Sequence, residues 1–196
     1  MADHLGLNPA RIERLRSAER LTYFDPARIW DVLDPAPDCT VLDIGTGVGF
    51  IALPFAKRYP NAKVYGCDIL DGMIALLRED AGAQGLANVE GIVMTPNAVD
   101  LPDDVADIVI MAQLHHELDE PAALLVECRR LLRPGGTVAI IDWADEDNGK
   151  SPPAGRRVPE ADLRAQLTAG GFTDLERHDV YTFHTFMTAR VPTDDL

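Results

Sequence analysis

Lysine is scarce in this sequence, and so is positive charge in general. The chain has 18 basic residues against 32 acidic ones, and only Lys57, Lys63 and Lys150 are lysines, so that its formal net charge is −14. A protein with this balance repels a polyanionic duplex unless its cations cluster, and here the cations are spread along the chain. The composition therefore argues against nucleic acid as a partner.

Cysteine is scarce as well. Cys39, Cys67 and Cys128 are odd in number, lie far apart and form no CxxC pair. This pattern disfavours a disulfide framework and a zinc site. We predict that the three side chains are buried apolar fillers and that the protein holds no metal.

Long apolar runs are missing from the start of the chain. Residues 1–16 carry charges throughout and contain no stretch that fits a signal peptide or a membrane span. We therefore expect a cytoplasmic protein without a membrane partner. The length of 196 residues, 46% of them hydrophobic, fits one domain.

Short apolar runs alternate with amphipathic segments in the middle of the sequence. The runs are rich in β-branched residues and predict strands, whereas the segments between them have helical spacing and the length of crossover connections. Because the strands are apolar almost throughout, helices should cover both faces of the sheet, as in a doubly wound α/β fold. The predicted strands are 40–44, 63–69, 89–94, 107–112 and 137–143.

The predicted helices follow the strands in order. One spans 51–59, the next spans 73–85 with Gly85 as its stop, and a third begins at Pro121. Pro134-Gly135-Gly136 is predicted to end the third helix.

The two ends of the chain depart from this alternation. Residues 1–37 predict one or two helices, 9–20 and 26–33, which either pack on the core or form a flap over a ligand. After the core, 38–145, the terminal part 146–196 begins with a polar loop and a helix, 160–169. Two strands then follow without a helix between them, and such strands must pair as an antiparallel hairpin.

The segment Asp43–Gly49, DIGTGVG, lies between the first strand and its helix. Glycine there allows a sharp turn and a close approach of ligand to backbone, and the helix start favours an anionic or polar group. The GxGxG spacing differs from the GxGxxG of dinucleotide-binding loops, which counts against NAD and FAD. Asp68, at the end of the second strand, can accept hydrogen bonds from two ribose hydroxyls, and its charge disfavours NADP.

Five segments carry a resemblance to a known family: VLDIGTGVGF, CDIL, NAVDLP, DIVIMAQLHHELD and LLRPGGTVAIIDW. In this order they resemble the class I S-adenosylmethionine (SAM)-dependent methyltransferases over residues 38–143. The resemblance implies a seven-stranded sheet of order 3-2-1-4-5-7-6 with strand 7 antiparallel, which agrees with the hairpin inferred above. It also implies SAM as the cofactor.

The resemblance further implies a set of cofactor-binding residues at the strand ends. Asp43 would lie near the methionine ammonium and Asp68 would hold the ribose. Asn97 stands where the family more often has Asp, and its carbonyl can still accept a hydrogen bond from the adenine amine. Gln113 would approach the cofactor through its backbone. The full set is Asp43, Gly45, Gly47, Asp68, Ile69, Asn97, Ala98 and Gln113.

The acceptor side is less defined, because methyl transfer from a sulfonium needs alignment and exclusion of water, and needs a base only when the acceptor is protonated. His115 and His116 follow the fourth strand and are the candidates for catalysis, with packing as the alternative. Trp143, at the end of the fifth strand, and Arg156 are the candidates for binding the acceptor. For Arg156 the alternative is a solvated surface arginine.

The expected acceptor is a small molecule that the sequence does not identify. An arsenite acceptor is disfavoured because Cys67 lies in a strand and Cys128 in a helical stripe, so that the thiols should not converge. A SAM-binding protein without transferase activity, acting as a sensor or partner subunit, is the alternative function. A nicotinamide-dependent oxidoreductase would share the fold but expects the other glycine spacing.

Overall fold

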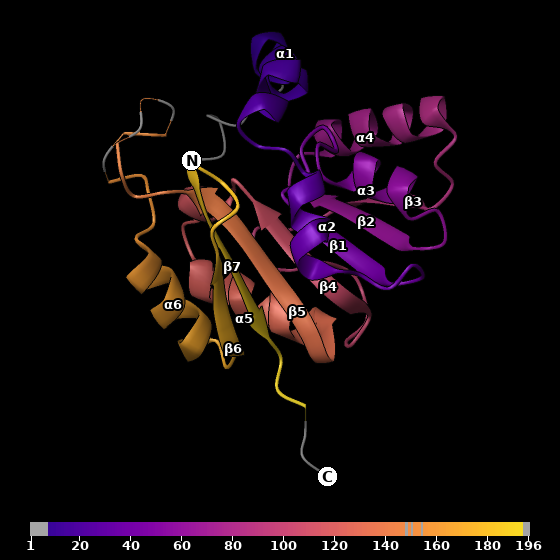
Figure 1. The fold of residues 1–196 in the computed structure, drawn as a ribbon. Coiled ribbons are helices and arrows are strands. Elements are labelled where there is room, and N and C mark those ends of the chain that lie inside the picture. Colours follow the sequence, from indigo (N-terminus) through magenta and orange to yellow (C-terminus); the bar gives the residue numbers. More distant parts are fainter. Residues whose placement is uncertain (1–7, 148, 150, 154, 194–196) are drawn as a thin grey trace.

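The computed structural model describes residues 8–147, 149, 151–153 and 155–193. Its centre is a seven-stranded sheet of order β3-β2-β1-β4-β5-β7-β6, with β1 to β5 parallel and β7 antiparallel to both of its neighbours (Figure 1). The predicted strand order and hairpin are confirmed. The strands are β1 (Thr40–Ile44), β2 (Lys63–Asp68), β3 (Val89–Val93), β4 (Ala106–Ala112), β5 (Leu132–Trp143), β6 (Thr173–His178) and β7 (His184–Arg190).

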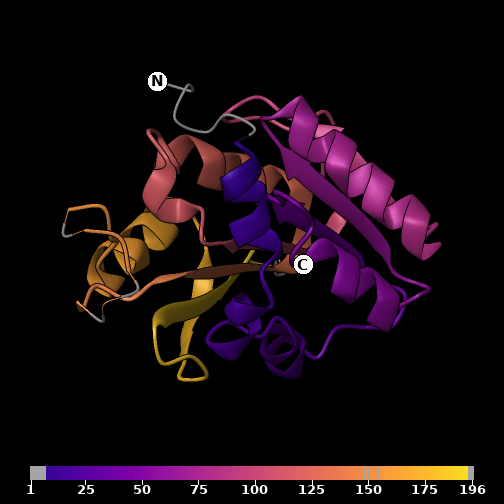
Figure 2. The same ribbon diagram turned by 90° about the horizontal axis from the view of Figure 1, so that it is seen from above.

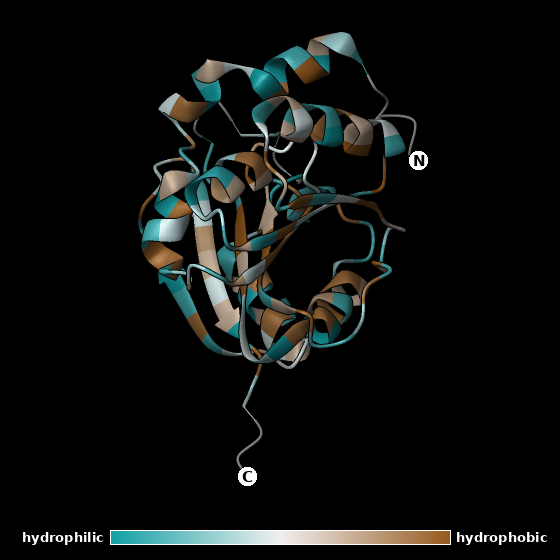
Figure 3. Ribbon diagram, turned by 90° about the vertical axis from the view of Figure 1, so that its right-hand side faces the viewer, coloured by the Kyte–Doolittle hydropathy of each residue, from teal (hydrophilic) through white to brown (hydrophobic). Residues whose placement is uncertain are grey.

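Helices cover both faces of the sheet. α5 and α6 pack on one face, whereas α2, α3 and α4 contribute to the apolar cluster on the other. Figure 3 shows helices of mixed hydropathy around the apolar strands, as expected for amphipathic helices on a buried sheet. The helices are α1 (Pro9–Arg16), α2 (Ala27–Leu33), α3 (Ala52–Arg58), α4 (Asp71–Gln84), α5 (Pro121–Leu131) and α6 (Glu160–Ala169), with 3-10 turns η2 (Ala18–Thr22) and η3 (His115–Glu117).

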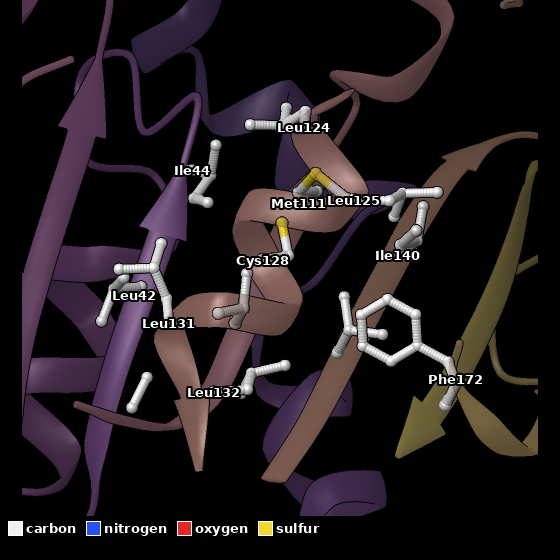
Figure 4. Packing of buried hydrophobic residues seen from close by; sticks show 14 of the residues in the cluster. Leu42, Ile44, Met111, Leu124, Leu125, Cys128, Leu131, Leu132, Ile140 and Phe172 are labelled. Atoms are coloured by element: carbon white, nitrogen blue, oxygen red, sulfur yellow. The ribbon is translucent and has the colours of Figure 1, made fainter. Parts of the chain in front are cut away.

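Strand β4 shows why the sheet needs cover on both sides. Val109 and Met111 belong to the cluster under α5 and α6, whereas Ile108 and Ile110 belong to the opposite cluster. Successive side chains of a strand point to opposite faces, so a strand that is apolar throughout must be buried on both. Figure 4 shows the first cluster, where Cys128 and its neighbours on α5 lie against the sheet.

The predicted end of the helix that begins at Pro121 is wrong. α5 ends at Leu131, and Leu132 is already extended, with φ −80° and ψ 136°. Leu132 is fully buried and pairs with Ala106 of β4, so that Pro134-Gly135-Gly136 lies inside β5. Burial and strand pairing of Leu132 therefore end the helix before the proline does.

The N-terminal segment, described from residue 8, also differs from its prediction. The expected helix 9–20 is interrupted at Ser17, whose hydroxyl accepts a hydrogen bond from the Glu19 N–H at 3.1 Å and caps η2. α1 buries none of its residues and lies over the carboxyl edge of the sheet (Figure 2). Arg16 pairs with Asp80 of α4 at 2.6 Å. In the described part of the chain, no helix is long and apolar enough to cross a membrane.

Candidate functional site

The glycine loop after β1 turns through three residues with positive φ: Gly45 (+74°), Gly47 (+54°) and Gly49 (+78°). A Cβ on Gly45 would lie 2.8 Å from Leu114, and a Cβ on Gly49 would lie 2.5 Å from Leu77. A Cβ on Gly47 would meet no heavy atom of the described residues within 4 Å. A side chain at Gly45 or Gly49 would thus have to displace neighbouring leucine side chains, whereas Gly47, among these three glycines, has open space beside its backbone.

Asp43 ties this loop to the helix that follows it. Its carboxylate is 2% exposed and accepts hydrogen bonds from the Thr46 hydroxyl at 2.7 Å and from the Ala52 N–H at 3.2 Å. Burial raises the pKa of Asp43 to about 7. The structure therefore gives Asp43 a role in shaping the loop, and a contact with the methionine ammonium stays a prediction.

Asp68 lies at the end of β2, next to the open glycine. One carboxylate oxygen accepts a hydrogen bond from the Gly47 N–H at 2.9 Å, and the other accepts from the Leu70 N–H at 3.0 Å. Burial raises the pKa of Asp68. Ile69, which follows it, is 36% exposed. This edge therefore places a carboxylate and an apolar side chain beside the loop glycine that has open space next to it.

The loop after β3 carries Asn97, which is predicted to bind the adenine amine, and Ala98, which belongs to the same predicted cofactor-binding set. The Asn97 side-chain amide donates to the Glu120 carboxylate at 2.6 Å, which leaves its carbonyl oxygen as an acceptor. Glu127 on α5 accepts a hydrogen bond from the Val99 N–H at 2.7 Å and pairs with Arg130. These contacts hold the loop against α5. The contact with Glu120 orients the Asn97 amide so that its carbonyl oxygen is left to accept the predicted hydrogen bond from the adenine amine.

Gln113 follows β4 and has a positive φ of 53°. Its N–H donates to the Ile141 carbonyl at 2.7 Å. Its side-chain oxygen accepts from Arg20 at 2.8 Å, and its side-chain nitrogen lies 2.7 Å from Nε2 of His184. The side chain of Gln113 thus links the N-terminal segment to β7, a role that the sequence did not predict.

Arg20 is the residue that sequence reasoning missed. It is 8% exposed, donates to the Leu15 carbonyl at 2.9 Å, and lies 3.8 Å from the ring centroid of Phe50, which follows the glycine loop. Burial lowers the pKa of Arg20, although a side-chain hydrogen bond with Tyr23 and, more weakly, the charge of Asp43 oppose this effect. None of the ion pairs within the described ranges includes Arg20. A buried cation without a carboxylate partner indicates a place for an anionic ligand group.

His116 and Asp142 form a pair where β4 and β5 end. Nδ1 of His116 lies 2.7 Å from one carboxylate oxygen of Asp142, and the His116 N–H donates to the other at 2.9 Å. The Trp143 N–H donates to Asp142 as well, at 2.7 Å. A carboxylate beside Nδ1 holds the proton on that nitrogen, so Nε2 of the neutral ring is left as a hydrogen-bond acceptor.

The neighbouring His115 turns away from this pair. It is 3% exposed, and its Nε2 lies 2.7 Å from the side-chain oxygen of Gln166 on α6. Burial lowers the pKa of His115. The turn η3 thus separates the two predicted histidines and places His115 in the packing between the sheet and α6.

Trp143 belongs to a group of rings at the same strand end. It pairs with His184 across β5 and β7, with ring centroids 4.5 Å apart, and it stacks on Tyr23 at 6.2 Å. We call Tyr23, Trp143 and His184 the aromatic wall. Arg156, in contrast, is exposed, while Arg157 donates to the Asp145 and Pro152 carbonyls and orders the loop.

The burial of His184 predicts an acid-sensitive fold. His184 is 4% exposed, and burial lowers its pKa to about 4. The unfolded chain therefore takes up a proton first, so the stability that His184 contributes is complete above about pH 6.5 and is lost as the pH falls towards 4.

We expect the His184→Gln variant to lose less unfolding free energy than the wild-type protein as the pH falls. Between pH 7 and pH 4, the wild-type protein should lose on the order of 2–3 kcal/mol more unfolding free energy than the variant. Urea unfolding at several pH values measures both slopes. Parallel slopes for the two proteins would show that His184 does not titrate in this way.

Comparisons with known proteins are in keeping with this geometry. A family model described as "Methyltransferase domain" matches residues 41–136. The crystal structure of a SAM-dependent methyltransferase from Aquifex aeolicus superposes with a TM-score of 0.87, at 32% identity, over 95% of this chain and 100% of that one.

Two curated relatives match more partially. A demethylmenaquinone methyltransferase from Thermus thermophilus is 32% identical over 117 residues, which are 60% of this chain and 52% of the relative. An arsenite methyltransferase from Halobacterium salinarum is 31% identical over 153 residues, which are 72% of this chain and 39% of the relative. The chain thus spans about half or less of the length of these two proteins.

Proposed function

Since the chain belongs to the class I SAM-dependent methyltransferases, we propose that it transfers the methyl group of SAM to a small-molecule acceptor. The observation that carries the proposal is the meeting of three features at one edge of the sheet. These are the open backbone of Gly47, the carboxylate of Asp68 beside it, and the buried cation of Arg20.

The residues at this edge of the sheet suit the separate parts of SAM. The Asp68 carboxylate suits the ribose hydroxyls, and the Asn97 carbonyl suits the adenine amine, with Ile69 and Ala98 on the two sides of the base. Arg20 suits the carboxylate of the methionine portion, because a charged ligand group would supply the partner that the protein does not.

The chain's own part in the reaction is to bind, to orient and to exclude water. SAM supplies an activated methyl group when bound. Gly47 and Asp68 fix the ligand along the strand ends, while α1 and η2 cover this edge of the sheet. Alignment of an acceptor with the methyl carbon then lowers the barrier, because the reacting atoms are held in the attack geometry.

The cysteines argue against a metalloid acceptor. All three are free and buried, and burial raises the pKa of Cys39 to about 11 and that of Cys128 to about 12. Burial raises the pKa of Cys67 as well. Since the thiolate is the form that binds a metalloid, the raised pKa values and the burial of these side chains disfavour a metalloid acceptor at neutral pH.

The proposal is tested by binding of S-adenosylhomocysteine (SAH). We expect Asp68→Ala to weaken SAH binding about thirtyfold, or about 2 kcal/mol, because two hydrogen bonds to a charged acceptor are lost. Titration calorimetry measures the change, and Asp162→Ala on the exposed side of α6 is the matched control. A folded Asp68→Ala variant with affinity within about twofold of wild type, below roughly 0.4 kcal/mol, would refute the ribose assignment.

Activity itself is tested by release of SAH in the presence of SAM and a panel of phenols, thiols, amines and carboxylates. Release with at least one acceptor is the expected result. SAH binding without release, in a structure with no space beyond the sulfur, would favour the alternative, a SAM-binding protein without transferase activity.

A further inference from the structure

Asp142 is placed to orient His116, and it is not free to meet a ligand. It is 3% exposed, and its two oxygens accept three N–H groups: the His116 backbone, the His116 ring and the Trp143 backbone. An imidazole held by a carboxylate at one nitrogen is oriented for proton transfer at the other.

The second ring nitrogen of His116 is left for that transfer. Glu117 is the other carboxylate beside the ring, and its oxygen lies 3.9 Å from Nε2, beyond hydrogen-bonding distance. The other oxygen of Glu117 lies 3.9 Å from the Arg11 guanidinium. The His116 side chain is 7% exposed, so an acceptor reaches Nε2 only when the side chains around the ring make room for it.

We propose that His116 is the general base of the methyl transfer and that the acceptor is a planar compound with a phenolic or enolic hydroxyl. This inference rests on the proposed function. A base is useful only when the acceptor atom carries a proton at the working pH. A carboxylate with a pKa near 4 is already ionised, whereas a phenol with a pKa of about 10 is protonated.

An ammonium acceptor also carries a proton, but the site does not suit its charge. Asp142 is saturated by N–H donors, and Glu117 lies beside Arg11. A cation bound here would have Glu117 as its nearest carboxylate, and it would share that carboxylate with Arg11. A neutral hydroxyl has no such need, which favours the hydroxyl over the amine.

The aromatic wall supplies the preference for a planar acceptor. Trp143 directly follows Asp142 at the end of β5, so the two side chains leave the sheet on opposite faces, and an acceptor reaches both the wall and the base by lying across the end of this strand. Tyr23 and Trp143 are partly exposed and stack with an interplanar angle of 27°. A flat aromatic ring bound against Trp143 is stabilised by stacking in addition to burial, whereas an aliphatic alcohol gains only burial.

In the proposed step the hydroxyl proton moves to Nε2 of His116. The oxygen uses its electron pair to form the bond to the methyl carbon, and the carbon–sulfur bond breaks with its pair remaining on sulfur, which becomes a neutral thioether. Asp142 stabilises the imidazolium, which then releases its proton to water.

The test compares two acceptors of similar shape, 4-methylphenol and 4-nitrophenol, at a pH where only the second is ionised. We expect His116→Gln to lower kcat/KM about 100-fold for 4-methylphenol, because general-base catalysis is lost. The loss should be less than about threefold for 4-nitrophenol, which needs no base. The same substitution at His178, which lies on β6 and bonds Thr188, is the control and should change neither rate.

Asp142 is tested as a positioning residue. Asp142→Asn should move the limb of the pH profile that reports the base to lower pH, because the imidazolium loses its carboxylate. A purely structural role would lower the rate without moving the profile.

A readout that does not depend on turnover is the NMR signal of the His116 ring, assigned by its loss in His116→Gln. Adding 4-methylphenol to the SAH complex should shift this signal. An unmoved signal, or equal rate losses for both phenols, would overturn the role of His116. Release of SAH only with amines, thiols or carboxylates, or with no phenol despite SAH binding, would overturn the acceptor class. Failure to bind SAH at all would instead refute the proposed function.

Discussion

Gly47→Val is expected to abolish SAH binding, with a loss of more than about 1000-fold, or about 4 kcal/mol, while the protein still folds. Gly47 is the loop glycine whose Cβ would point into open space, beside the Asp68 carboxylate. A branched side chain there occupies the path that the ligand must take along the backbone. The positive φ of Gly47 adds strain of about 1–3 kcal/mol to the folded state, which a domain of this size tolerates.

Substitutions at two further glycines distinguish a steric clash of the new Cβ from strain in the backbone. Gly49→Ala should lower the unfolding free energy more than Gly47→Ala does, because its Cβ would lie 2.5 Å from Leu77 and 2.8 Å from Leu53. Gly82→Ala in α4 should be neutral or stabilising, because it sits in a helix with open space around it. Thermal unfolding with and without SAH measures both quantities for each variant. A Gly47→Val protein that SAH stabilises as much as wild type would show that the glycine serves the turn alone.

Arg20→Met is expected to weaken SAH binding by about two to three orders of magnitude, about 3–4 kcal/mol, because the ligand carboxylate would be buried without its partner. The unfolding free energy of the ligand-free protein should fall by a smaller amount, about 1–2 kcal/mol. Methionine keeps much of the apolar stem and removes a buried charge that has no carboxylate partner within the described residues, but the hydrogen bonds to Leu15 and Gln113 and the contact with Phe50 are lost.

Adenosine distinguishes this role from a general loss of structure, since it lacks the amino acid portion. Its affinity should stay within about threefold of wild type in Arg20→Met, roughly 0.7 kcal/mol. Calorimetry with both ligands on the same preparation gives the comparison, and Arg14→Met, on the exposed side of α1, is the matched control. Equal losses for adenosine and SAH would mean that Arg20 supports the fold of the site and does not contact the carboxylate.

The order of elements could be predicted because it depends on features local in the chain. The β-branched run 40–44 and the helix 160–169 have the predicted bounds. The absence of a helix between β6 and β7 indicated an antiparallel pair, and the structure has it. Where local features competed with burial, burial decided, as at Leu132, which extends into β5 before the proline is reached.

Within the site, the sequence by itself determined the loop DIGTGVG and the acidic residue at the end of β2, because backbone freedom and strand ends can be recognised from residue types and spacing. Only the tertiary structure decided which glycine faces open space, which histidine meets Asp142, and that Arg20 is buried. These properties depend on contacts between distant parts of the chain. His116 and Asp142 are 26 residues apart, and Arg20 and Gln113 are 93 residues apart. No periodicity in a sequence encodes such pairs, because they arise only when the sheet brings its strand ends to one edge.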